Sequence, residues 1–175
     1  MIETRIKSAI RDVPDFPLKG VLFKDLTPVL KDTKLCQEIT EEFAKRLRGT
    51  GLDAIAGIES RGFLFGLMLA ARLGLPFLLI RKKGKLPYKP ITINYQLEYG
   101  SSQLEMQGGD VHPGWKVLIH DDVLATGGTA SAAAKLVLSQ EGQIAGFLFL
   151  MELKFLTGRE KIQELSQNII SLASY

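Results

Sequence analysis

The sequence predicts an α/β domain with a doubly wound, mainly parallel sheet that is flanked by helices. Two observations predict this fold. From residue 53 onward, short apolar runs alternate with longer segments of helical character. The apolar runs are also nearly continuous, which is typical of strands covered on both faces. Strand, helix and strand in succession indicate parallel pairing through right-handed crossovers.

Two helices are expected before the first strand of this sheet. Isoleucines recur at helical spacing over residues 2–10, and the prolines and glycine of DVPDFPLKG break that pattern. Residues 35–47 keep one helical face apolar, and the glycines at 49 and 51 end the segment. The strands are then expected at 53–58, 76–82, 115–121, 144–152 and 168–174, and the helices between them at 63–74, 129–142 and 158–165.

Residues 82–111 interrupt the alternation of strands and helices. Glycines and prolines recur there, with weakly strand-like TINYQLEY and SQLEMQ between them. A long insertion in a compact domain is usually functional or disordered. The aromatic and β-branched residues favour a flexible β-hairpin that closes over a site as a lid. The basic run RKKGKLPYK, which overlaps its start, suits nucleic acid or a small polyphosphate, or else is a solvated loop.

Length and composition fit one domain over residues 1–175. Hydrophobic residues make up 46% and charged residues 23% of the chain, as in ordinary globular proteins. The longest apolar stretch, 62–71, would be about 15 Å long as a helix, too short to span a bilayer. We therefore expect no membrane contact. With Cys36 as the single cysteine, an intrachain disulfide and a cysteine-based zinc site are excluded, and a reducing cytoplasm is expected.

The segment VLIHDDVLATGGTA (117–130) carries the strongest functional signal. Ligands of open parallel sheets bind beyond the carboxyl ends of the strands, where Asp121 and Asp122 are expected. The loop 125–129 that follows opens a helix, and the free N–H groups and dipole of a helix start favour an anion. The glycines of that loop let the backbone curve around a phosphate, and its threonines add hydroxyl donors.

The rest of this pattern narrows the ligand. Neither GxxxxGK[ST] nor GxGxxG occurs, so a Walker loop and a dinucleotide fingerprint are excluded. Adjacent carboxylates can accept hydrogen bonds from sugar hydroxyls and help to hold hydrated Mg²⁺. A phosphorylated ribose would satisfy both the loop and the acids. The alternative is a turn followed by an ordinary glycine-rich connection.

The same segment resembles the motif with which type I phosphoribosyltransferases bind phosphoribosyl pyrophosphate (PRPP). Further segments resemble the members of that family that act on adenine: PDFPLKGVLFKDLTPVL (14–30), AGIESRGFLFG (56–66), LIRKKGKLPYKPITINYQLEYG (79–100) and LKFLTGREKI (153–162). The resemblance implies transfer of ribose 5-phosphate from PRPP to N9 of adenine, giving AMP and pyrophosphate with Mg²⁺ as cofactor. It also implies a homodimer, with residues 1–34 containing the hood that recognises the base and 82–111 the lid.

The resemblance implies a role for each matching residue. The 5-phosphate and ribose are assigned to Asp121, Asp122, Ala125, Thr126, Gly127, Gly128 and Thr129. The pyrophosphate is assigned to Glu59, Ser60, Arg61, Arg81, Lys82 and Lys85, in a loop where family members carry a non-proline cis peptide. No direct protein ligand of Mg²⁺ is assigned: the ion would be held through PRPP and water, with or without help from Asp121 and Asp122. A cation such as Arg61 at a helix start is disfavoured unless an anion binds there.

The base and the lid complete the assignment. Adenine is assigned to Leu22, Phe23 and Lys24, where family members usually have arginine in place of Lys24. Phe23 can stack on a purine, or it can be a plain core residue. Glu98 is implied as the general acid/base and Tyr99 as its neighbour over the site; in an open lid, Glu98 would instead face solvent.

Three other functions remain open at this point. A phosphoribosyltransferase for another base, such as xanthine or orotate, would keep the PRPP site but fits the 14–30 segment poorly. A regulator that senses PRPP without catalysis would need an effector surface, for which the first 50 residues leave little room. A nonspecific nucleic-acid binder would fit the net charge of +3 but gives the acid pair no role. We therefore expect no nucleic-acid partner.

Overall fold

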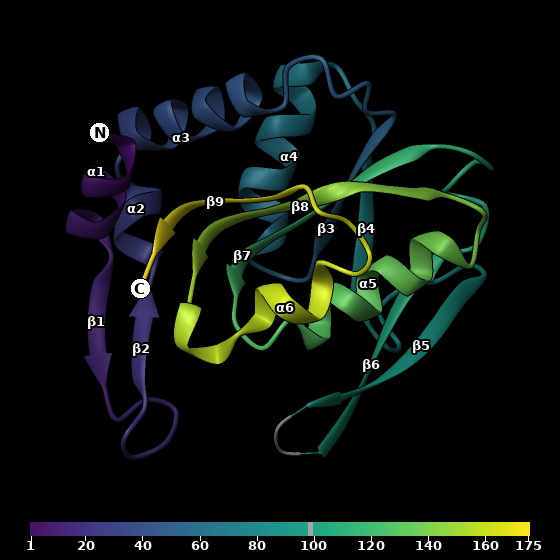
Figure 1. Cartoon of the computed structure of the whole chain (residues 1–175). Helices are drawn as coiled ribbons and strands as arrows, with labels where there is room; N and C mark the ends of the chain where they lie inside the picture. The colour runs from purple at the N-terminus through teal and green to yellow at the C-terminus, as the bar shows by residue number, and fades with distance from the viewer. Residues whose placement is uncertain (98–99) are drawn as a thin grey trace.

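The computed structural model, which describes residues 1–97 and 100–175, has a seven-stranded sheet in the order β5-β6-β4-β3-β7-β8-β9 (Figure 1). Five strands pair in parallel: β4 (Phe77–Lys82), β3 (Ala54–Ile58), β7 (Lys116–Leu124), β8 (Gln143–Glu152) and β9 (Ile169–Ser174). The hairpin of β5 (Pro90–Leu97) and β6 (Gly100–Gln107) is antiparallel and joins the sheet beside β4. The mainly parallel sheet predicted from the sequence is confirmed.

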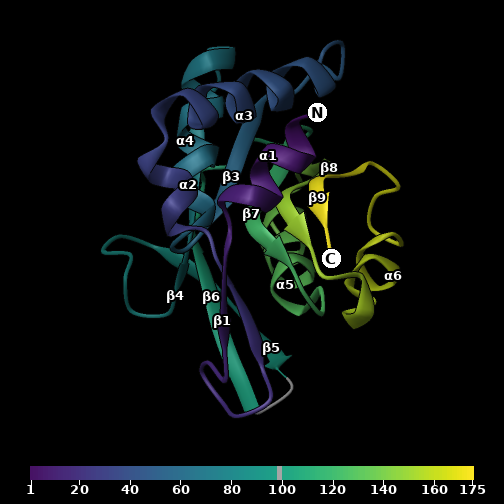
Figure 2. The same cartoon turned by 90° about the vertical axis from the view of Figure 1, so that its left-hand side faces the viewer.

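Helices cover both faces of this sheet. One face carries α1 (Ile2–Ala9), α3 (Thr33–Arg46) and α4 (Gly62–Leu73), and the other carries α5 (Gly128–Leu138) and α6 (Gly158–Ile162). Successive residues of a strand point to opposite faces. In β7, Leu118 accordingly packs in the core cluster with α3 and α4, and Ile119 in the cluster with α5. Figure 2 shows the sheet between α4 and α5.

The segment before the sheet is more ordered than the sequence predicts. Only a break was expected after α1, but β1 (Arg11–Pro14) and β2 (Leu22–Asp25) form an antiparallel hairpin, and α2 (Thr27–Lys31) follows it. Strands this short, with prolines in and after β1, leave no measurable period in the sequence. We call this β1–β2 hairpin the hood.

The hood and the β5–β6 hairpin both project from the same side of the molecule (Figures 1 and 2). The β5–β6 hairpin is joined to the sheet by a short pairing of β6 with the end of β4, at Arg81↔Glu105 and Lys82↔Leu104. Buried Glu105 strengthens this base by accepting from the N–H groups of Lys85 and Leu86, both at 2.8 Å. The hairpin expected within 82–111 is therefore present, and its movement as a lid stays a prediction.

A short 3₁₀ turn, η1 (Lys154–Leu156), links β8 to α6. Among the described residues, no helix is long and apolar enough to cross a membrane.

Candidate active site

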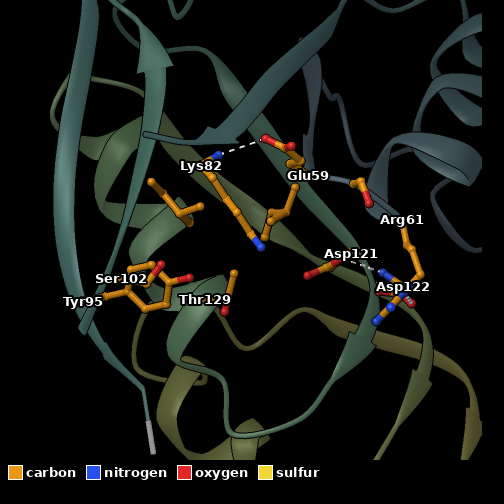
Figure 3. Close-up of a pocket in the computed structure, with 11 residues that line it drawn as sticks. Glu59, Arg61, Lys82, Tyr95, Ser102, Asp121, Asp122 and Thr129 are labelled. Atoms are coloured by element: carbon orange, nitrogen blue, oxygen red, sulfur yellow. Dashed lines mark hydrogen bonds and ion pairs between the residues drawn. The ribbon is translucent and has the colours of Figure 1, made fainter. Parts of the chain in front are cut away.

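A cavity of about 340 Å³ lies where β3, β4 and β7 end, which is the edge at which a parallel sheet binds ligands (Figure 3). It brings together side chains that the sequence placed far apart. Those assigned to PRPP that line it are Glu59, Ser60, Arg61, Lys82, Asp121, Asp122 and Thr129. Their different chemical types, from cations to carboxylates, suit a ligand that carries both phosphate and hydroxyl groups.

The loop 125–129 forms a smaller hollow of about 60 Å³ beside this cavity. The helix α5 begins at its end, and Gly127 holds the cap position with a φ of +76°, a left-handed conformation that favours glycine. Within the described part of the chain, no side-chain cap hydrogen bond forms at the start of α5. Its N–H groups therefore remain available to an anion at the positive end of the helix dipole.

A second glycine shapes this loop from behind. A Cβ atom on Gly158, at the start of α6, would lie 2.1 Å from the carbonyl oxygen of Ala125, and one on Gly127 would lie 2.6 Å from the oxygen of Gly158. The two backbones are therefore packed directly against each other. Gly158 carries no role predicted from the sequence; its one signal there was its place inside the 153–162 segment that resembles the family.

The two adjacent acids lie in different environments. Asp122 is 4% exposed and forms an ion pair with Arg61, which also lines the cavity. Burial raises the pKa of Asp121 well above its ordinary value, and the charge of Asp122 adds to this effect. In this state Arg61 neutralises one member of the pair. A ribose that binds both acids must therefore replace or rearrange this ion pair.

Glu59 organises the opposite wall of the cavity. It accepts from the guanidinium of Arg81 at 3.2 and 3.4 Å and from the N–H of Lys82 at 3.0 Å. Burial acts to raise the pKa of Glu59, but these hydrogen bonds outweigh burial and the pKa falls below its ordinary value. The Glu59–Ser60 peptide bond is cis, as the resemblance implies.

The basic residues near this wall differ in whether their side chains enter the cavity. The side chain of Lys82 extends into the cavity (Figure 3). Arg81 is held by Glu59 and donates to the carbonyl oxygen of Lys85 at 3.1 Å. Arg81 and Lys85 do not line the cavity, and Lys85 is exposed. The structure therefore brings Lys82 to the site directly and leaves the other two at its border.

The hood places Phe23 near the cavity. Its ring lies 5.7 Å from the guanidinium carbon of Arg61 and packs edge to face with Phe16 at 5.1 Å. Phe23 is half-buried and lies outside both core clusters, which favours the stacking interpretation over plain core packing. Leu22 is exposed and does not line the cavity. Lys24 points elsewhere, since its ammonium contacts Asp12 at 2.6 Å.

The β5–β6 hairpin contributes side chains that the sequence analysis missed. Tyr95, Ser102 and Leu104 line the cavity. Strand alternation within TINYQLEY would have placed residue 95 on one face of the hairpin, but nothing in the sequence indicated which face turns to the site. The catalytic assignment of Glu98 and the lid assignment of Tyr99 lie outside the described residues.

His120, which precedes the acids, is fully buried. Its Nδ1 lies 2.9 Å from the carbonyl oxygen of Leu148, its ring packs against Phe43 at 5.7 Å, and its Nε2 has no partner among the described residues. Burial lowers the pKa of His120 from 6.5 to about 4. The unfolded chain therefore takes up this proton first as the pH falls.

We expect His120 to make folding stability depend on pH. Because the folded-state pKa is the lower one, its contribution is complete above about pH 6.5 and is lost as the pH falls toward 4, by about 3 kcal/mol in total. The comparison is urea unfolding of wild type and His120→Leu between pH 4 and 7.5, with exposed His112→Asn as the control. If the free energy of unfolding falls equally with pH in wild type and in His120→Leu, His120 is not the source of the pH dependence.

Comparison with known proteins places these features in a family. The model of the phosphoribosyl transferase domain matches residues 28–171. The adenine phosphoribosyltransferase of Cytophaga hutchinsonii is 49% identical over 175 residues, covering 100% of this chain and 97% of that protein. The one from Caldanaerobacter subterraneus is 51% identical over 170 residues, covering 97% of each.

Solved structures agree with these relatives. The crystal structure of adenine phosphoribosyltransferase from Thermoanaerobacter pseudethanolicus superposes with a TM-score of 0.95 at 49% identity and covers 100% of both chains. The enzyme from Saccharomyces cerevisiae superposes with a TM-score of 0.92 at 39% identity, covering 98% of both chains. Its structure is complexed with adenine and D-2,5-dideoxy-2,5-imino-altritol 1,6-bisphosphate.

Proposed function

The chain belongs to the phosphoribosyltransferase family, and from this premise we propose that it transfers the 5-phosphoribosyl group of PRPP to N9 of adenine. The products are AMP and pyrophosphate, which is a purine salvage reaction of the pentosyltransferase type. The observation that best supports this function is the cavity, which is lined by two acids and by Arg61 and Lys82 and which adjoins the hollow at the start of α5. Full-length similarity to adenine phosphoribosyltransferases supports adenine as the base.

We propose that PRPP lies across the cavity from α5 to the end of β3. Its 5-phosphate accepts hydrogen bonds from the N–H groups of the loop 125–129, and its ribose hydroxyls donate to Asp121 and Asp122. The pyrophosphate then lies near Ser60, Arg61 and Lys82. Three features support this placement of the 5-phosphate, ribose and pyrophosphate: the free N–H groups in the first turn of α5, the adjacent carboxylates, and the cations Arg61 and Lys82.

Adenine is proposed to bind on the hood side of the ribose. Phe23 offers an aromatic face beside Arg61, and we propose that backbone groups of β2 read the edge of the base. The side chain of Lys24 is already held by Asp12, so we do not assign it a contact with the base. The replacement of the family's usual arginine by Lys24 is therefore compatible with recognition through the backbone.

The chemical step forms the C1–N9 bond and breaks the bond from C1 to pyrophosphate. By analogy with glycoside cleavage, the sugar develops oxocarbenium character, which water would intercept. We propose that the β5–β6 hairpin closes as a lid and excludes that water, a role that the presence of Tyr95 in the cavity wall supports. Glu98 is proposed as the general acid/base, which accepts the proton that adenine loses when the C1–N9 bond forms. Tyr99 is proposed to lie next to it over the site.

Mg²⁺ is proposed as the cofactor, held mainly by PRPP oxygens and water. Within residues 1–97 and 100–175, no three His, Cys, Asp or Glu side chains are grouped as a metal site. The two carboxylates at the cavity fit the sparse protein ligation that Mg²⁺ accepts. When bound, the ion would neutralise the leaving pyrophosphate. Calorimetry should show weak Mg²⁺ binding to the protein alone and tighter PRPP binding when Mg²⁺ is present.

A homodimer is proposed on the basis of an apolar surface on α4. Leu64, Leu67 and Met68 share one side of the helix and are 39%, 57% and 38% exposed. A second copy of this chain would cover these side chains. Sedimentation velocity is expected to show a dimer in wild type and a monomer in Leu67→Lys; a wild-type monomer would contradict the proposal. We also propose a cytoplasmic location. Cys36 is buried and forms no disulfide, and a free thiol fits the reducing environment of the cytoplasm.

A panel of bases tests the activity directly. Wild-type protein is given PRPP, Mg²⁺ and one base at a time, and both pyrophosphate release and the nucleotide formed are followed. We expect AMP from adenine and far slower turnover of hypoxanthine, guanine, xanthine and orotate. If another base is turned over faster than adenine, the proposed PRPP site stands, but the proposal that the hood recognises adenine is wrong. PRPP binding without any turnover would instead favour the regulator.

A further inference from the structure

The side chain of Lys24 is fixed on the far side of the hood from the cavity. Its ammonium contacts Asp12 at 2.6 Å and lies 4.3 Å from the centre of the Tyr175 ring, within the range of a cation–π interaction. The lysine side chain is 13% exposed, whereas the Asp12 side chain is 53% exposed, so the ion pair is open to water on the Asp12 side. Asp12 is the residue paired with Lys24 across the hood, which makes the ion pair part of the hairpin itself.

Tyr175 is in turn fixed to the sheet. Its N–H donates to the carbonyl oxygen of Glu152 at 2.9 Å, and its own carbonyl oxygen accepts from the N–H of Lys154 at 2.9 Å. Its ring packs against the core cluster shared by α1 and α3, and Lys7 of α1 approaches the ring centre to 5.3 Å. Tyr175 therefore joins the hood, through Lys24, to the rigid end of the sheet.

The neighbour of Lys24 in β2 is Phe23. Successive side chains of a strand point to opposite faces, so one side of β2 carries Phe23 toward Arg61 while the other carries Lys24 toward Tyr175. The hood is a two-stranded hairpin, and an isolated two-stranded hairpin is marginally stable in water. A contact on the Lys24 side therefore helps to determine where the Phe23 side lies.

We propose that Tyr175 is a positioning residue for the base: by holding Lys24 it fixes β2, and with it Phe23, beside the active-site cavity. The inference rests on the proposed adenine activity. It assigns Tyr175 no contact with substrate. The effect is accordingly larger for adenine than for PRPP, because the loop 125–129 and the acid pair lie on other elements and only Arg61 among the residues proposed for PRPP contacts Phe23.

Two variants separate the aromatic face from the bulk of the side chain. The hydroxyl of Tyr175 is buried and has no hydrogen-bond partner among the described residues, so Tyr175→Phe keeps the ring and loses no contact. Tyr175→Leu keeps an apolar side chain but removes the π face. Steady-state kinetics should show that Tyr175→Leu raises the KM for adenine about two- to fivefold, the range that corresponds to a lost cation–π interaction, with a clearly smaller change in the KM for PRPP. Tyr175→Phe should match wild type.

Lys24→Met supplies a second test of the same link. It should raise the KM for adenine at least as much as Tyr175→Leu does, because it also removes the ion pair with Asp12. The Lys24→Met/Tyr175→Leu double variant should match Lys24→Met, because Tyr175→Leu has no Lys24 ammonium left to release. An unchanged adenine KM in Tyr175→Leu, or an equal rise in both KM values, would overturn the inference. If wild type makes no AMP, the proposed function fails and this inference fails with it. An active wild type with an insensitive Tyr175→Leu variant refutes the inference alone.

Discussion

A Gly158→Ala variant is expected to lose about 100-fold of kcat/KM for PRPP, although Gly158 is not assigned a contact with substrate. The new methyl group would lie 2.1 Å from the carbonyl oxygen of Ala125, a separation that real Cβ atoms do not show. Either α6 or the phosphate-binding loop must therefore move. A displacement of about 1 Å in a positioning element can cost about two orders of magnitude in rate.

The control for Gly158→Ala is Gly74→Ala. Gly74 ends α4 with a φ of +67° and has open space where its Cβ would be. Alanine there strains the backbone, so it should lower the melting temperature without changing the kinetics. Gly158→Ala should instead weaken PRPP binding at a temperature where both variants are folded. Normal PRPP kinetics in Gly158→Ala would mean that the loop is not the phosphate site or that α6 moves freely.

Asp122→Asn is expected to lower kcat/KM for PRPP by about 10- to 100-fold. A hydrogen bond to a charged group is worth about 1.5–3 kcal/mol, and the neutral amide loses that strength toward a ribose hydroxyl. The substitution also removes the charge that pairs with Arg61, so the arginine no longer has a fixed partner in the empty site. We expect kcat/KM for adenine, measured at saturating PRPP, to change less.

Asp53→Asn is the matched control for this substitution. Asp53 accepts from the N–H of Lys116 at 2.7 Å at the opposite end of β7, and an asparagine oxygen can still accept this bond. Its kinetics should equal those of wild type. If Asp122→Asn also shows wild-type kinetics for PRPP, the buried acid serves only to hold Arg61, and the ribose assignment is wrong.

The sheet and the grouping of the acid pair with the start of a helix were predictable because their signals are local. Continuous apolar runs mark strands covered on both faces, and a helix start after Asp121 and Asp122 marks an anion site wherever the chain folds. The segment 117–130 therefore carried its own chemistry. The cavity then brings it together with residues 59–61 and with Lys82, as parallel strands that end at one edge require.

The contacts between distant segments were not predictable in the same way. Three contacts join residues that are far apart in sequence: the ion pair of Arg61 with Asp122, the packing of Gly158 behind the loop 125–129, and the cation–π contact of Lys24 with Tyr175. No period or motif encodes such a contact, because it depends on how finished elements pack. The resemblance placed a hood within residues 1–34, but the pairing of β1 with β2 was not predicted, because strands of four residues are too short to show alternation.

The central claim is that the cavity binds PRPP with its phosphate on α5 and its ribose on the acid pair. A crystal structure of the protein with PRPP, Mg²⁺ and 9-deazaadenine, an adenine analogue with carbon at position 9, tests it most directly. We predict the 5-phosphate within hydrogen-bond distance of the N–H groups of residues 126–129, the ribose hydroxyls on Asp121 and Asp122, and the base against Phe23. A 5-phosphate bound elsewhere, with the loop 125–129 empty and Arg61 still paired with Asp122, would contradict the account.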